Sequence, residues 1–143
     1  MDKALNRILA GSDYSVVEEF SLPPREARCR EIPEFLADSG VGGWLQGLAA
    51  RHGGLWNHQA LALERIGGGS NLVVCTGTAS GKSLIFRAAV FHRTLCEPKT
   101  RALVLYPLKA LASDQAVAWK QQARELGLPE GFVGRIDGTV PVS

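Results

Sequence analysis

The chain has 143 residues, of which 45% are hydrophobic and 21% charged, and its formal net charge is +2. This length suits one ordinary domain and is too short for two, and the composition argues against disorder. Sixteen basic and fourteen acidic residues exclude a heavily basic nucleic-acid coat protein. The charge is uneven, because residues 1–50 have a net charge of −3 and residues 51–143 one of +5. The second region therefore better suits a phosphate-bearing partner.

Localisation and cysteine chemistry follow from what the sequence contains. No apolar run approaches the ~20 residues of a membrane span, and the N-terminus lacks the apolar stretch of a secretory signal. The three cysteines, Cys29, Cys75 and Cys96, are odd in number and widely spaced, without a CxxC pair. We therefore expect a cytoplasmic protein with reduced, buried thiols and no membrane partner.

Residues 1–50 are rich in turn signals, and Pro23 and Pro24 impose an extended segment. Short helices are predicted between the turns, at 3–9 and 44–51. The region has too few large apolar residues for a core of its own. We expect an N-terminal helical arm that lies on the following domain.

In residues 51–143, helical patterns alternate with short apolar runs typical of strands. Helices are predicted at 57–66, 82–96 and 108–126, and strands at 71–75, 101–106 and 132–136. Nearly continuous apolar strands joined by helices indicate a parallel sheet covered on both faces. The predicted fold class is therefore α/β.

The strongest chemical signal is the segment TGTASGKS, between the predicted strand at 71–75 and the predicted helix at 82–96. A phosphate-binding P-loop requires this order of strand, loop and helix. The loop consists of Thr76, Gly77, Thr78, Ala79, Ser80, Gly81, Lys82 and Ser83. Its backbone N–H groups can surround a phosphate at the positive end of the helix dipole.

Individual residues of this loop suit nucleotide binding. Gly81 lets the backbone approach a phosphate, because it has no Cβ. Lys82 supplies a point charge for the β- and γ-phosphates, and the Ser83 hydroxyl can be a ligand of Mg²⁺. Thr76 departs from the pattern G-x-x-x-x-G-K-S/T, which has glycine at this position. The alternative is a Gly/Ser-rich turn capped by Ser80, which the register of strand, loop and helix disfavours.

Two segments outside the loop carry weaker signals. Leu55–Gln59 reads LWNHQ and ends 23 residues before Lys82, whereas Leu103–Gln115 reads LVLYPLKALASDQ. The second segment puts Lys109 in the first turn of a predicted helix, where the helix dipole disfavours a cation. A bound anion would compensate, and backbone N–H groups at the same helix start could hold a phosphate of a nucleic acid.

Together, WNHQ, TGTASGKS and YPLKALASDQ resemble the Q-motif, motif I and motif Ia of superfamily 2 DEAD/DEAH-box helicases. The residues of these motifs are most similar to those of the RecQ-related mitomycin-repair-factor-type DNA helicases. The similarity covers roughly residues 20–140. It implies that residues 51–143 belong to a RecA-like ATP-binding domain, an incomplete three-layer lobe, and that residues 1–50 precede the helicase core.

This resemblance implies a role for each matched residue. Gln59 would recognise the adenine edge of ATP. The loop from Thr76 to Ser83 would hold the triphosphate, with Ser83 on Mg²⁺. Pro107 and Lys109 would contact the backbone of one strand, so the implied partner is a nucleic acid, most of all single-stranded DNA.

One part on which this family depends does not occur in the sequence. The DExH carboxylates hold Mg²⁺ and orient the attacking water, and the 143 residues contain no such tetrad and no second lobe. We therefore expect the N-terminal portion of an ATP-dependent DNA helicase, truncated before the DExH motif, without catalytic residues of its own and inactive alone. The remainder of the helicase, if another chain supplied it, would be a partner. Two alternatives stay open: a P-loop module that binds nucleotide without hydrolysis, and a non-functional truncated product.

The remaining aromatic and histidine residues are expected to be structural. Trp44 and Trp119 are predicted to anchor the core, whereas Trp56, near Gln59, could flank the adenine. The three histidines are not spaced as metal ligands with the cysteines, and we interpret them as surface or packed residues. They are His52, His58 and His92.

Overall fold

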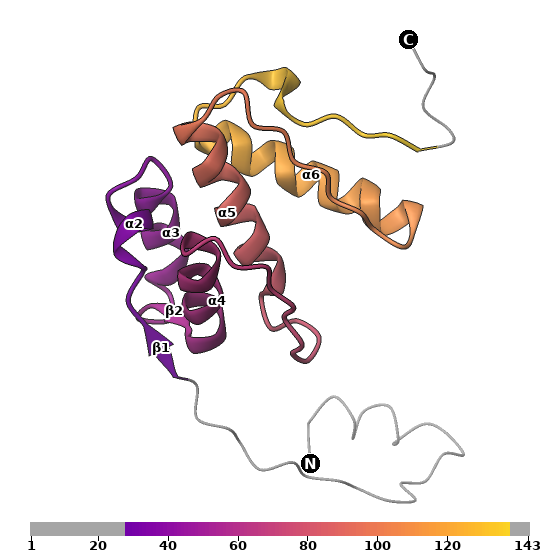
Figure 1. The fold of residues 1–143 in the computed structure, drawn as a ribbon. Helices are drawn as coiled ribbons and strands as arrows, with labels where there is room; N and C mark the ends of the chain where they lie inside the picture. The colour runs from indigo at the N-terminus through magenta and orange to yellow at the C-terminus, as the bar shows by residue number, and fades with distance from the viewer. Residues whose placement is uncertain (1–27, 138–143) are drawn as a thin grey trace, which may run out of the picture.

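The computed structural model describes residues 28–137, and Figure 1 shows their arrangement. In chain order the elements are β1 (Cys29–Arg30), α2 (Glu34–Ala37), α3 (Gly42–Ala49), β2 (Leu55–Trp56), α4 (Asn57–Gly67), α5 (Lys82–Cys96), α6 (Lys109–Glu125) and the 3₁₀-helix η1 (Glu130–Phe132). None of the described helices is both long and apolar enough to cross a membrane. The helix predicted at 3–9 lies outside the described residues.

The predicted helices within this range are confirmed. Helix α5 has the predicted bounds, α4 runs one residue further to Gly67, and α6 is one residue shorter at each end. The helix expected at 44–51 is α3, which begins earlier, at Gly42, and ends at Ala49. The glycine run from Gly67 ends α4, because glycine favours helix termination.

A two-residue antiparallel pairing fixes the start of α4. Strands β1 and β2 place Cys29 opposite Trp56 and Arg30 opposite Leu55. Gly54, just before β2, has φ +147°, and a Cβ on it would collide with the Arg30 carbonyl oxygen. Only glycine therefore lets the two segments approach this closely.

Helix α5 lies at the centre of the core, with α2, α3 and α4 on one side and α6 on the other (Figure 1). Its Phe91 is completely buried. The Phe91 ring lies 5.6 Å from the ring of Trp44, 5.0 Å from that of Trp119 and 6.0 Å from that of Phe132, measured between centroids. The prediction that Trp44 and Trp119 anchor the core is confirmed.

The same core includes residues on both sides of position 50. Leu36, Val41 and Leu45, from the segment before it, are fully buried in one cluster with Leu63 of α4 and Phe91 of α5. Residues 28–50 thus pack on the helices that follow. The division into an arm at 1–50 and a domain at 51–143 stays a proposal.

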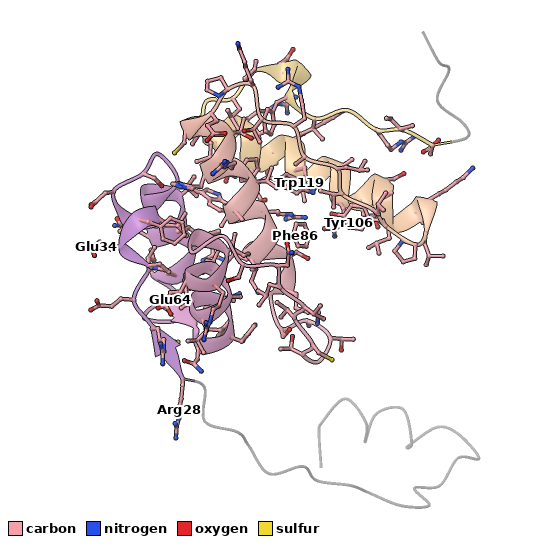
Figure 2. The ribbon with its side chains drawn as sticks, in the orientation of Figure 1. Arg28, Glu34, Glu64, Phe86, Tyr106 and Trp119 are labelled. Atoms are coloured by element: carbon pink, nitrogen blue, oxygen red, sulfur yellow. The ribbon has the colours of Figure 1, made fainter. Side chains whose placement is uncertain are left out.

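A buried arginine joins α5 to α6. Arg87 is only 7% exposed, and it donates from Nη1 to Oε1 of Gln122 at 3.1 Å and from Nη2 to Oε1 of Gln115. Its guanidinium lies 5.6 Å from the centroid of the Trp119 ring, whose Nε1 donates to the Tyr106 hydroxyl at 3.1 Å (Figure 2). Burial lowers the pKa of Arg87, and Tyr106 partly offsets this effect.

The predicted parallel sheet is not formed among the described residues. The segments 71–75, 101–106 and 132–136 pair with no strand there, and apolar side chains on them are exposed: Val73 by 93% and Leu105 by 81%. The second and third segments both line a groove of about 900 Å³. Paired strands lie ~4.8 Å apart and exchange backbone hydrogen bonds, and the only sheet among residues 28–137 is the pair β1–β2.

The absent sheet also explains why Cys75 is not buried as expected. Cys29 is half-buried, but Cys75 and Cys96 are exposed, so the expectation of buried thiols is wrong for these two. Cys75 ends the segment 71–75, and burial there requires neighbouring strands.

Replacing Phe91 with alanine should destabilise the chain by about 3–5 kcal/mol, because it leaves a cavity among the packed rings. Urea unfolding followed by circular dichroism measures the loss. Val117, exposed on α6, provides the control: Val117→Ala should change the free energy of unfolding by less than about 0.5 kcal/mol. Coincident unfolding curves for Phe91→Ala and wild type would contradict the central position of this ring.

Candidate functional site

The loop from Thr76 to Ser83 turns sharply at two residues before α5. Ala79 has φ +57° and Gly81, the N-cap of α5, has φ +76°. Ala79 is the only non-glycine residue with positive φ among residues 28–137. This left-handed conformation costs a residue with a Cβ about 1–2 kcal/mol, so contacts around the loop must maintain it.

The Lys82 side chain supplies three of these contacts. Its Nζ donates to the carbonyl oxygens of Thr76 at 2.8 Å and Gly77 at 2.6 Å, and to the Ser80 Oγ at 3.3 Å. These bonds use the three donors of the ammonium group. The cation thus lies inside the loop, and a bond to a phosphate oxygen would replace at least one of these contacts.

A hydrogen bond between hydroxyls explains the departure at Thr76. Its Oγ1 lies 2.6 Å from the Ser80 Oγ, on the opposite side of the loop. Glycine, which the strict P-loop pattern has here, could not make this bond. Thr76 and Ser80 therefore stabilise a loop conformation that also surrounds the Lys82 ammonium.

Helix α4 supports the loop from outside. The Gln59 Oε1 accepts the Trp56 N–H at 3.0 Å, and the Gln59 Nε2 donates to the Gly81 carbonyl oxygen at 3.1 Å. The neighbouring His58 Nε2 lies 2.9 Å from the Ser80 carbonyl oxygen. Gln59 is only 4% exposed, so water competes little for its bonds. The structure thus places Gln59 beside the loop from Thr76 to Ser83.

Ser83 follows Lys82 in the first turn of α5 and is half-buried. Its hydroxyl is an oxygen donor of the type that Mg²⁺ prefers. The loop thus offers a cation, backbone N–H groups and a hydroxyl at one helix end.

The two other predicted contact residues lie at the start of a different helix. Lys109 is the first residue of α6, Pro107 precedes it by two positions, and both are exposed. They line the groove of about 900 Å³ together with Arg101 and Arg135. Arg135 donates to the Ser113 Oγ at 2.7 Å, so a second basic group approaches the first turns of α6. In Figure 1, α5 begins near the middle of the picture and α6 begins at its right.

Sequence reasoning missed two residues at these sites. His58 was expected to be a surface or packed residue, although its place beside Gln59 was a usable signal. Arg135 had no such signal, because 22 residues separate it from Ser113 and only the chain path brings them together.

The DEAD/DEAH box helicase family model matches residues 56–136, more than half of the chain. The matched range contains the loop, the residues of α4 that contact it and the start of α6. The chain belongs to the DEAD/DEAH box helicase family, as its motifs predicted.

Individual relatives agree with this assignment. The chain is 35% identical to the ATP-dependent helicase HRQ1 of Saccharomyces cerevisiae over 71% of its length and 9% of HRQ1. It is 32% identical to the uncharacterized ATP-dependent helicase YprA of Bacillus subtilis, over 88% of this chain and 17% of YprA. A crystal structure of the DUF1998 helicase MrfA bound to DNA and AMPPNP is similar with a TM-score of 0.67 and 32% identity, over 87% of this chain and 17% of MrfA. The chain thus spans less than a fifth of each of these relatives.

Gly81→Ala should lower the free energy of unfolding by about 1–2 kcal/mol, because the added Cβ meets a left-handed backbone and collides with the Gln59 Nε2. Urea unfolding measures the loss. Gly77→Ala is the matched control in the same loop, since no atom lies within 4 Å of its Cβ position and its φ is not positive. An equal loss in the two variants would contradict a special role for Gly81.

Proposed function

We propose that this chain forms part of the RecA-like ATP-binding lobe of an ATP-dependent DNA helicase, and that the loop from Thr76 to Ser83 binds the phosphates of Mg·ATP. One observation carries the proposal: the Lys82 ammonium lies inside a loop at the N-terminal end of α5. A charge-assisted bond, backbone N–H groups and the helix dipole would then act on one phosphate group. Membership of the DEAD/DEAH box helicase family supports this reading.

The donor set fits a magnesium ion that is held together with the nucleotide. Mg²⁺ usually keeps several waters and takes few ligands from the protein besides the phosphates. Ser83 supplies one hydroxyl next to Lys82. When bound, the ion would neutralise charge on the phosphates, while the residues of the chain hold and orient them.

We assign adenine recognition to Gln59. Its side-chain amide makes one bond from the oxygen and one from the nitrogen, both to the backbone. An amide has one further N–H and one further lone pair, which match the donor and acceptor pattern of an adenine edge. Trp56, half-buried beside it, could flank the base.

The same proposal gives the start of α6 a role in binding single-stranded DNA. Pro107 and Lys109 are exposed there. The N–H groups of a first helical turn lack partners within the helix, so they and the Lys109 ammonium could hold backbone phosphates. That the similar structure of MrfA was solved bound to DNA supports a nucleic acid as the ligand.

We further propose that the 143-residue chain binds ATP without hydrolysing it at a significant rate. Hydrolysis needs an oriented water as well as a held phosphate, and the sequence contains no DExH tetrad. The chain would correspond to the part of the lobe that precedes this tetrad. Hydrolysis and unwinding would then require the tetrad and a second lobe, in the same polypeptide or in another.

Lys82→Ala should weaken binding of Mg·ATP by about 1.5–3 kcal/mol, because it removes a charge-assisted bond to phosphate. Isothermal titration calorimetry measures the dissociation constants. Lys99→Ala, which removes an exposed cation after α5, is the charge-matched control and should bind as the wild type does. Equal titration curves for wild type and Lys82→Ala would contradict the proposal.

Lys109→Ala should weaken binding of single-stranded DNA about equally for all sequences, because phosphates carry no sequence information. Loss of one phosphate contact should reduce the slope of log K against log salt by about 0.7. Fluorescence anisotropy at several salt concentrations measures both effects. Lys120→Ala, on the same helix, should leave the slope unchanged. An unaltered slope in Lys109→Ala would contradict the assigned contact.

A further inference from the structure

Two adjacent side chains of α4 meet two adjacent carbonyl groups of the P-loop. His58 meets the Ser80 carbonyl oxygen at 2.9 Å, and Gln59 meets the Gly81 carbonyl oxygen at 3.1 Å. Successive residues of α4 therefore bind successive carbonyl groups of the loop. Since both oxygens are bound by α4, both face the same side of the loop.

The direction of each of these carbonyl groups also fixes the direction of the N–H group in the same peptide plane. All peptide bonds in the described residues are trans, and in a planar trans peptide the C=O and the N–H point in opposite directions. The Ser80 carbonyl shares its plane with the Gly81 N–H, and the Gly81 carbonyl shares its plane with the Lys82 N–H. With both oxygens held toward α4, these two N–H groups point away from it.

We infer that His58 is a positioning residue for phosphate binding, a role that rests on the proposed binding of ATP. By holding the Ser80 carbonyl, His58 keeps the Gly81 N–H directed toward the bound phosphate. The Gly81 carbonyl, and with it the Lys82 N–H, is held by Gln59 and by the Leu84 N–H of α5. The hydrogen bond requires that the Nε2 of His58 carries a hydrogen, because a carbonyl oxygen only accepts. In this role His58 acts through the Ser80 carbonyl and not through a contact with the nucleotide.

The orientation of Gln59 supports the same arrangement. Its Oε1 accepts the Trp56 N–H, so its Nε2 must face the Gly81 carbonyl. The flipped amide would set donor against donor and acceptor against acceptor. The bond from Gln59 is therefore fixed at both ends, and His58 adds a second restraint one peptide earlier. His52 and His92 have no hydrogen bond to this loop within residues 28–137: the His52 ring packs against Trp56 at a tilt, and the His92 ring meets Phe35 edge to face.

The role of His58 predicts a specific pattern of nucleotide affinity. His58→Leu should raise the dissociation constants for ATP and for GTP by the same factor, about threefold to tenfold, because both nucleotides have the same triphosphate. His58→Gln, which restores an N–H donor of similar reach, should recover most of the affinity. His92→Leu is the matched control and should bind as the wild type does. Titration calorimetry on the full 143-residue chain measures all four proteins, and thermal unfolding verifies that each is folded.

Each outcome distinguishes this inference from the proposed function. Wild-type affinity in His58→Leu, or a loss for ATP without an equal loss for GTP, overturns the role of His58 alone. A wild-type chain that binds no nucleotide overturns the proposed function, and the role of His58 with it. NMR of the imidazole nitrogens needs no variant: a hydrogen on Nε2 is expected, and an Nε2 without one overturns the hydrogen bond itself.

Discussion

The structure depends on the burial of one helix, α5, between its neighbours. Phe91 and Ala88 are completely buried on this helix, and rings from α3, α6 and η1 surround Phe91. The N-terminal end of the same helix forms the last part of the P-loop. Because a packed interior resists displacement, the loop is attached to a rigid base, and the groups proposed to bind phosphate share its position.

Helix α4 holds the loop in its observed conformation. Its buried face packs on α5, which brings Gln59 and His58 within hydrogen-bonding distance of successive loop carbonyls. The loop is further closed by Lys82 and by the bond between Thr76 and Ser80. A loop restrained on both sides loses less conformational entropy when it binds a ligand than a free one does. The segment with His58 and Gln59 thus has a structural role in holding the loop.

The segments 71–75, 101–106 and 132–136, unlike the helices, lack partners of this kind. Their apolar side chains Val73, Leu105 and Ile136 are exposed, and the segments have no strand partners in the described part of the chain. A strand has no internal hydrogen bonds, so its backbone groups bond either to water or to a neighbouring strand at ~4.8 Å. Unpaired apolar segments of this kind favour association with other chains. A neighbouring strand on each would cover the exposed side chains.

The sequence by itself determined the local features of this protein. Its periodicity located α4, α5 and α6 to within one residue, because helices satisfy their own backbone hydrogen bonds. The segments WNHQ, TGTASGKS and YPLKALASDQ together indicated the family. Tertiary structure alone decided what depends on distant residues. It placed His58 on the loop and brought Arg135 to the start of α6. It also left the predicted strands unpaired, because apolar character makes a segment suited to a sheet, but only a second segment at the right distance makes it a strand.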